Sequence, residues 1–284
     1  MGEGLGPVEL VGGEDHRGAR LDGVVEEAVD QVAAGGVEAG VGLVQQPELG
    51  PPGRHDRDGG AAALVAGKDL RIEARSRVAT NQVIPLAFCI LLVFAFALDP
   101  DRGTLTAAAP GLFWVAVLLS TVLGAQRSFS VETADGTRDA LRLSGLDPAG
   151  IFLGKSGALA VQLLVLEVLL GVGVVVLYTT DLRLEGVALL VVAGLVTTVG
   201  LATTSTLFGA LSAGLRVRET LFPLLLIPAV TPVLIGATRA YEAALGTGGA
   251  DTSEGWPWVG LLGVFALAYS AFGLLGFGTL MEEQ

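Results

Sequence analysis

From Val78 onward the chain is built mainly of apolar runs that are long enough to cross a membrane. A transmembrane helix needs about 20 mostly apolar residues, because the hydrocarbon core of a bilayer is about 30 Å thick. Backbone groups in lipid must be satisfied internally, so such runs fold as helices and not as isolated strands. The sequence therefore predicts an all-α membrane protein with six transmembrane helices, at residues 78–98, 105–126, 156–178, 187–213, 219–240 and 257–280.

The composition excludes several other classes of protein. Hydrophobic residues make up 51% of the 284 residues and charged residues only 16%, whereas soluble domains have about 25% charged residues. A formal net charge of −12 excludes a basic nucleic-acid-binding protein, and one cysteine excludes an intramolecular disulfide. Both histidines, His16 and His55, precede the apolar runs. We therefore expect no metal or cofactor bound by the membrane part of this chain.

The first 67 residues differ in kind from the rest. They contain no aromatic residue and no Ile, Ser, Thr, Asn, Lys or Cys, and every residue type after Met1 has codons that can begin with G or C. With 16 glycines, 12 acidic residues and 4 basic residues, this leader cannot form a core and is predicted to be disordered. It is either an over-assigned start, with the native start near Leu64–Gly67, or a genuine acidic tail. The membrane domain is expected over 68–284.

Basic residues predict the orientation of the helices, because cytoplasmic loops are enriched in Lys and Arg. Outside the leader, ten basic residues lie before the first span and in the second and fourth connections, against three toward the other side of the membrane. This distribution places both termini in the cytoplasm. Four aromatic residues then fall near the outer interface, where amphipathic rings are favoured: Tyr178, Tyr241, Trp256 and Trp258.

The segment Lys68–Arg77 predicts a short amphipathic helix on the inner membrane surface, before the first span. Its candidate interface residues are Lys68, Asp69, Arg71, Glu73 and Arg75. Two interpretations are open for this helix. It is a positive-inside anchor, or it is a docking surface for a cytoplasmic partner.

The longest predicted cytoplasmic connection is 127–154. It contains the turn pair Asp135-Gly136 and then a helix-sized piece, with Thr137 as its N-cap. A short helix there can receive force from a soluble motor, whereas an ordinary solvated loop is the alternative. The candidate residues for contact with an ATPase are Arg127, Asp135, Gly136, Thr137, Leu141 and Arg142.

Glu167 lies in the middle of the third predicted span. An ionisable residue there costs about 2.5–3.5 kcal/mol on insertion scales, so we expect it to face protein. It either makes a hydrogen bond between helices or takes part in a transport path or in subunit coupling. The fourth span is rich in small and hydroxyl residues, which predict close helix packing, with a substrate-lining face as the alternative.

The chain is not expected to be an enzyme. No Ser/His/Asp set, Cys–His pair or carboxylate cluster occurs outside the leader. Catalysis would therefore have to come from a partner chain.

A stretch around the second span resembles the heme exporter protein B (CcmB) family. The resemblance is carried by Ala109-Pro110-Gly111, by Trp114 with the two residues after it and by Ser120 with the two leucines before it. It continues through Arg127-Ser128-Phe129, Asp135-Gly136 and Gly154-Lys155. The family usually has Glu-Arg where this chain has Gln126-Arg127.

The resemblance implies the six-helix ABC-2-type permease architecture and a place in a bacterial inner membrane. It implies a complex with an ATP-binding CcmA-like subunit and with CcmC-like and CcmD-like membrane proteins, and a second copy of this chain is a further candidate partner. Heme is then the possible substrate and ATP is bound by the partner subunit. The chain would couple ATP hydrolysis to heme delivery or to release of a heme-loaded chaperone. Residues 68–284 contain no histidine, which favours mechanical coupling over a His-ligated heme station in this subunit.

Three other functions are open. The chain could be an ABC-2-type permease for a drug, lipid or polysaccharide, or a passive scaffold for its partners. It could also be a secondary transporter that works without ATP. Ion coupling in such transporters normally uses intramembrane charges, and Glu167 is the one ionisable residue well inside a predicted span.

Overall fold

The computed structural model describes residues 54–76, 79–98, 103–134, 147–178, 183–213 and 218–282. Within these ranges the regular structure is helical and no strand occurs. The elements are α2 (Arg54–Ser76), the π-helical turn η1 (Ala79–Val83), α3 (Ile84–Ala97), α4 (Thr104–Ala134), α6 (Pro148–Tyr178), α7 (Leu184–Ala213), α8 (Arg218–Leu245), the 3₁₀ turn η3 (Thr247–Gly249) and α9 (Thr252–Glu282).

Five of these helices, α4, α6, α7, α8 and α9, are long and apolar enough to cross a membrane. They confirm the last five predicted spans. The first predicted span is instead a shorter apolar helix, Asn81–Ala97. Its N-terminal part is the π-helical turn η1, and a proline lies in the first turn of α3. Proline removes a backbone donor, so it is tolerated at a helix start and interrupts a longer helix.

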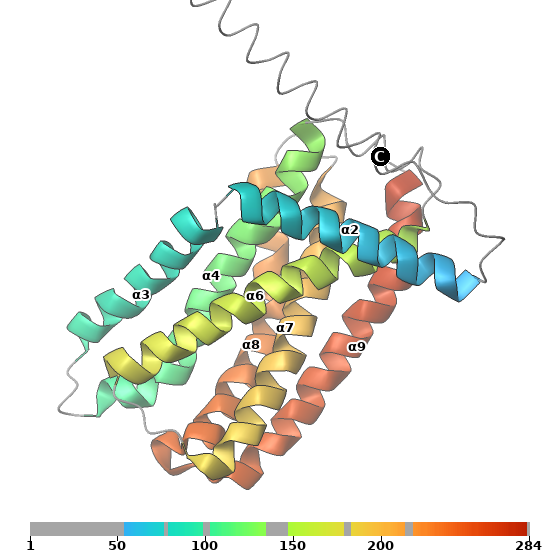
Figure 1. Ribbon diagram of the computed structural model, residues 1–284. Coiled ribbons are helices and arrows are strands. Elements are labelled where there is room, and N and C mark those ends of the chain that lie inside the picture. Colours follow the sequence, from blue (N-terminus) through green and yellow to red (C-terminus); the bar gives the residue numbers. More distant parts are fainter. Residues whose placement is uncertain are drawn as a thin grey trace, which may run out of the picture. The chain divides into compact units, whose positions relative to one another are not determined.

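The helix α7 lies at the centre of the bundle and contacts α4, α6, α8 and α9 (Figure 1). Its buried hydroxyl groups mostly donate to carbonyls one turn back in the same helix, as Thr203 does to Val199 and Thr204 does to Gly200. Hydroxyl side chains that are satisfied in this way leave room for close packing. These hydroxyl groups are buried in the bundle as the packing interpretation expects, and the substrate-lining alternative stays a prediction.

Two of the four aromatic residues predicted near the outer interface, Tyr178 and Tyr241, are buried by protein. Tyr178 is buried and its hydroxyl donates to the carbonyl of Leu91 at 2.9 Å, which ties the end of α6 to α3. Tyr241 is buried among aromatic rings of α4. A buried tyrosine is stable when its hydroxyl finds an acceptor, and the position of that acceptor cannot be read from composition. Trp256 is 47% exposed, as an interfacial residue should be.

The helix predicted at 68–77 begins earlier, at Arg54, and ends at Ser76. The run Ala61-Ala62-Ala63 supplies strong helix formers, and Ala61 and Val65 are buried. Residues 54–67 of the predicted leader are therefore helical, whereas 1–53 lie outside the described residues. Figure 1 shows α2 lying across α6, which it contacts along much of its length.

Candidate functional site

The long connection between the second and third predicted spans is shorter than expected, because both helices extend into it. The helix α4 continues to Ala134 and α6 begins at Pro148. Arg127 therefore lies on α4 and not in a loop. We call residues 127–134 and 148–155 the two stems of the connection. The other candidate ATPase-contact residues lie outside the described residues: Asp135, Gly136, Thr137, Leu141 and Arg142.

The α6 stem begins with a capping interaction. The Asp147 carboxylate accepts hydrogen bonds from the backbone N–H groups of Ala149 at 3.0 Å and Gly150 at 3.3 Å. These two donors have no partner within the helix, so the cap stabilises its first turn. The end of the connection is thus held in a defined place where α6 starts.

Two carboxylates of α2 reach the two stems. Asp69 lies 3.6 Å from the ammonium of Lys155 on α6, and Glu73 lies 3.8 Å from the guanidinium of Arg127 on α4. Asp69 also pairs with Lys68 at 2.8 Å. Residues four apart on a helix share one face, so one face of α2 contacts both stems. We call these two interhelical ion pairs the stem clamp.

Lys155 links the clamp to the rest of the bundle. Its side chain is only 4% exposed, and its ammonium lies 4.9 Å from the centre of the Phe129 ring on α4. The same ring packs directly on Gly209 of α7, where a Cβ would overlap it. A cation over an aromatic face is stabilised, more so when it is shielded from water. Lys155 therefore lies at a buried junction between α2, α4 and α6.

The clamp also has an apolar part. At Gly154 a Cβ would lie 2.6 Å from Cβ of Val65 and 2.7 Å from the carbonyl oxygen of Ala62, so α2 and α6 approach closely there. Phe152 on the same stem is buried with Phe277 of α9, at a ring-centroid distance of 5.5 Å. Small residues permit such close backbone approach between membrane helices.

Glu167, the predicted intramembrane polar residue, is 7% exposed. The Thr198 hydroxyl of α7 donates a hydrogen bond to Glu167 Oε1 at 2.6 Å. The second oxygen, Oε2, would lie 3.4 Å from a Cβ at Gly194, and the Tyr241 hydroxyl would lie 2.8 Å from the same atom. Glu167 therefore faces protein as expected, and Thr198 is the partner that sequence reasoning could not name.

A cavity of about 460 Å³ adjoins this carboxyl group. Its walls are mainly apolar and come from α4, α6, α7 and α8, with Pro110, Phe113, Gly194 and Tyr241 among them. Val168 and Val172 of α6 line it and are 68% and 61% exposed, so it opens on the outer surface of the bundle. An apolar cavity with few polar groups is the ordinary form of a small-molecule site.

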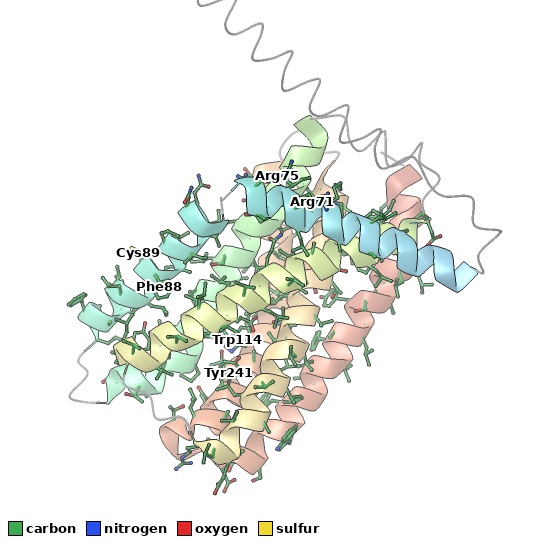
Figure 2. The ribbon with its side chains drawn as sticks, viewed as in Figure 1. Arg71, Arg75, Phe88, Cys89, Trp114 and Tyr241 are labelled. Atoms are coloured by element: carbon green, nitrogen blue, oxygen red, sulfur yellow. The ribbon has the colours of Figure 1, made fainter. Side chains whose placement is uncertain are left out.

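Two of the motif residues of α4, Pro110 and Trp114, line this cavity or contact residues that line it. Pro110 lines the wall, and Trp114 is buried against Phe113 and Tyr241 at centroid distances of 5.2 Å and 5.0 Å (Figure 2). Gly111 faces Thr238 of α8 at an ordinary contact distance. Ser120 is buried and donates to the carbonyl of Ala116 at 2.8 Å. The motif core is therefore a packing surface between α4 and α8 that also shapes the cavity.

Comparison with known proteins agrees with this architecture. The family model described as CcmB protein matches residues 61–278, which is most of the chain. The chain belongs to the CcmB protein family. The match includes α3 and all five long helices of this multi-pass membrane protein, together with α2 from Ala61 onward.

Three CcmB relatives, each named heme exporter protein B, illustrate the range of similarity. The protein from Paracoccus denitrificans is 28% identical over 210 residues, covering 72% of this chain and 92% of its own length. That from Haemophilus influenzae is 33% identical over 162 residues, covering 56% of this chain and 72% of its own. That from Pseudomonas aeruginosa is 29% identical over 200 residues, covering 67% and 84%.

Proposed function

We propose that this chain is the membrane subunit of an ABC-type complex for heme export and cytochrome c maturation in a bacterial inner membrane. Its relatives are named heme exporter protein B, and the family match covers residues 61–278. ATP is hydrolysed by a separate ATP-binding subunit, and CcmC-like and CcmD-like membrane proteins complete the complex. The observation that carries the proposal is the stem clamp, because it joins both ends of the cytoplasmic connection to one helix.

The clamp provides a route for motion. Arg127 and Lys155 each lie two turns from the connection, one on α4 and the other on α6, and their partners Glu73 and Asp69 are one turn apart on α2. An ATP-binding subunit that pushes on residues 135–147 would displace both stems together. Buried ion pairs and close-packed helices transmit such displacements as a unit, because packed interfaces do not deform continuously.

Mechanical coupling to release of a heme-loaded chaperone accounts for these features better than heme ligation within the subunit. Residues 68–284 contain no histidine. A second candidate is a substrate path through the cavity beside Glu167, which its volume of about 460 Å³ favours. An ABC-2-type permease for another substrate would use the same cavity.

The proposed topology has six spans, with both termini in the cytoplasm. The segment from η1 through α3 is the first span, and it packs on α4 and α6. At 1.5 Å per residue the apolar helix Asn81–Ala97 is about 25 Å long, slightly less than the hydrocarbon thickness. A short span is accommodated by local thinning of the bilayer. Reporter fusions after residues 100 and 145 would give opposite sides of the membrane under this topology.

The functional test uses two glycines of α6, Gly154 in the stem and Gly157 just after it. In a host whose own copy is deleted, Gly154→Ala is expected to lower the amount of c-type cytochromes severalfold, because the new Cβ would separate α2 from α6. Gly157→Ala is the matched control, since a Cβ there meets nothing within 4 Å. The level of protein in the membrane is measured alongside, and b-type cytochromes should not change. If deletion of the chain leaves c-type cytochromes intact, the proposed function is wrong.

The coupling role has a separate readout. ATP hydrolysis by the purified complex is measured together with release of the heme-loaded chaperone, with residues 137–143 replaced by a Gly/Ser linker. Coupling predicts that hydrolysis continues while release falls. A passive scaffold predicts that release is unchanged.

A further inference from the structure

The helix α2 has two chemically different faces. Two acidic residues in the C-terminal half of α2, Asp69 and Glu73, are turned toward the bundle. Their side chains are 10% and 18% exposed. Their charges are balanced there by Lys155 of α6 and Arg127 of α4. The inward face also buries Val65. The tertiary structure thus removes the negative charge of this part of the helix from its outer surface.

The outward face keeps its positive charge. Arg71 and Arg75 are exposed and one turn apart, and neither forms an ion pair with another described residue (Figure 2). Leu64 lies two turns before Arg71 and is 46% exposed, and Ile72 is 39% exposed. The exposed face therefore combines two guanidinium groups with two aliphatic side chains. This is the composition of a helix that lies in the interface of a membrane.

The position of α2 also points to lipid. A cavity of about 290 Å³ lies among α2, the η1–α3 segment, α4 and α6, and Leu70 and Ala74 of α2 and Val161 and Val165 of α6 are among its lining residues. These valines are 46% and 56% exposed. They begin a stripe along α6 that continues through Val168, Val172 and Val176. A stripe of exposed valines on a membrane-spanning helix is suited to contact hydrocarbon, and α2 packs on α6 near the start of this stripe.

We propose that the outward face of α2 is a binding site for anionic phospholipid headgroups. The guanidinium groups of Arg71 and Arg75 would bind headgroup phosphates, which match their planar donors, while Leu64 and Ile72 contact the upper acyl region. Positive charges at a membrane surface attract anionic lipid by about 1 kcal/mol each, which corresponds to about fivefold in affinity. Lipid binding at this site does not require an ATP-binding partner, so it can be tested independently of the proposed function.

Native mass spectrometry of the purified full chain tests the site, with phosphatidylglycerol and phosphatidylcholine supplied in equal amounts. The wild type is expected to retain more phosphatidylglycerol. The double variant Arg71→Gln/Arg75→Gln should lose at least about tenfold of this preference. The variant Arg71→Lys/Arg75→Lys, which keeps the charge, should retain most of it. Arg239→Gln is the control, because Arg239 is an exposed arginine on another helix, α8.

Three outcomes would overturn the proposal. One is an unchanged phosphatidylglycerol preference in the folded Arg71→Gln/Arg75→Gln variant, with folding checked by thermal unfolding in detergent. Another is an equal loss of preference in Arg239→Gln, which would mean that any surface arginine acts alike. The third is a double variant that keeps its lipid preference but no longer co-purifies with the ATP-binding subunit. That result would assign the face to a protein partner.

Discussion

Thr198 Oγ1 of α7 lies 2.6 Å from Oε1 of Glu167 on α6 and 2.8 Å from the carbonyl oxygen of Gly194, so the single hydroxyl proton is shared between two acceptors. One hydroxyl group of the central helix thus lies between a carbonyl of its own helix and a carboxyl group of the neighbouring helix. The two residues are 31 positions apart in the chain. Polar contacts of this kind join membrane helices because lipid offers no competing partner.

Removing the Thr198 hydroxyl should weaken the contact between α6 and α7. We expect Thr198→Ala to lower the free energy of unfolding by about 1 kcal/mol. Glu167→Gln keeps an oxygen that accepts from Thr198, so its effect should be smaller. Unfolding of both variants and of the double variant in detergent gives the coupling energy. Strictly additive effects would show that the hydrogen bond contributes nothing.

The variant Glu167→Gln also distinguishes a transport or coupling role of the carboxyl group from its contribution to helix packing. If Glu167 only joins helices, Glu167→Gln should leave c-type cytochrome levels unchanged while Glu167→Ala lowers them together with stability. A loss of c-type cytochromes in a stable Glu167→Gln protein would instead assign the carboxyl group to a transport path or to subunit coupling.

Gly194 and Gly171 line the same cavity but differ in the space around them. A Cβ at Gly194 would lie 2.8 Å from the Tyr241 hydroxyl, whereas a Cβ at Gly171 meets nothing within 4 Å. Tyr241 is held by Phe113 and Trp114, so it cannot easily move away. We expect Gly194→Ala to destabilise the protein by about 1–3 kcal/mol. Gly171→Ala should be neutral or slightly stabilising, because alanine favours helices.

Thermal unfolding in the same detergent measures both glycine variants. Equal melting temperatures for Gly194→Ala and Gly171→Ala would contradict the close contact at Tyr241. Because both positions border the cavity, a difference in stability between them reports on packing and not on the loss of cavity volume alone.

The two ion pairs of the stem clamp should differ in strength. Lys155 is 4% exposed and Asp69 is 10% exposed, so Asp69→Asn leaves a buried ammonium with fewer anionic neighbours. We expect it to cost about 3 kcal/mol. The pair between Arg127 and Glu73 is more exposed, at 32% and 18%. Glu73→Gln is therefore expected to cost only about 0.5–1 kcal/mol, as ion pairs nearer solvent do.

Asp69→Asn and Glu73→Gln can be compared directly, because both residues lie on α2 and each contacts a different stem. Unfolding and c-type cytochrome levels should rank in the same order, with Asp69→Asn the more severe. A more severe effect of Glu73→Gln would mean that burial does not decide the strength of the clamp.

Asp251 gives a prediction about pH. Its carboxylate accepts hydrogen bonds from the backbone N–H and the hydroxyl of Ser253, at 2.9 Å and 3.1 Å, where α9 begins. The backbone hydrogen bond first, and the hydroxyl second, hold the pKa of Asp251 below its usual value. A folded-state pKa below the unfolded one means that the unfolded chain binds the proton more readily, so the carboxylate stabilises the fold at higher pH.

The stabilisation by Asp251 should therefore be present above about pH 4 and be lost as the pH falls further through the folded-state pKa. Melting temperatures of the wild type and Asp251→Ala, measured between pH 7 and pH 3, are expected to differ at neutral pH and to converge at the acid end. A difference that stays constant over this range would show that the charge of the cap is unimportant.

Much of the fold could be predicted because a membrane limits the choices. The five long helices lie where the apolar runs predicted them, since length and hydropathy are local properties. The ends of α4 and α6 were predicted less well. Polar residues such as Arg127 continue a helix once other protein covers them, and the hydropathy of a segment does not contain that information.

The candidate site likewise contains residues that could be predicted from the sequence and residues that could not. Glu167 was found from the sequence because a carboxyl group inside an apolar run is unusual, and Trp114 was found because it belongs to a family motif. The partners Thr198 and Tyr241 were not found, because hydroxyl groups are common in membrane helices. A helical-wheel analysis could not have identified Thr198 or Tyr241, because it does not show which residues of α7 and α8 lie against α6.

The residue order alone determined that this chain forms apolar membrane helices and that it belongs to the CcmB family, because both depend on local composition and on short motifs. Only the tertiary structure decided which charges of α2 are buried. Asp69 and Glu73 lose their exposure because Lys155 and Arg127, which are distant in the chain, are brought against them. Arg71 and Arg75 keep theirs because no described helix covers the opposite face. Pairing across space depends on how helices cross, and a linear pattern does not specify that crossing.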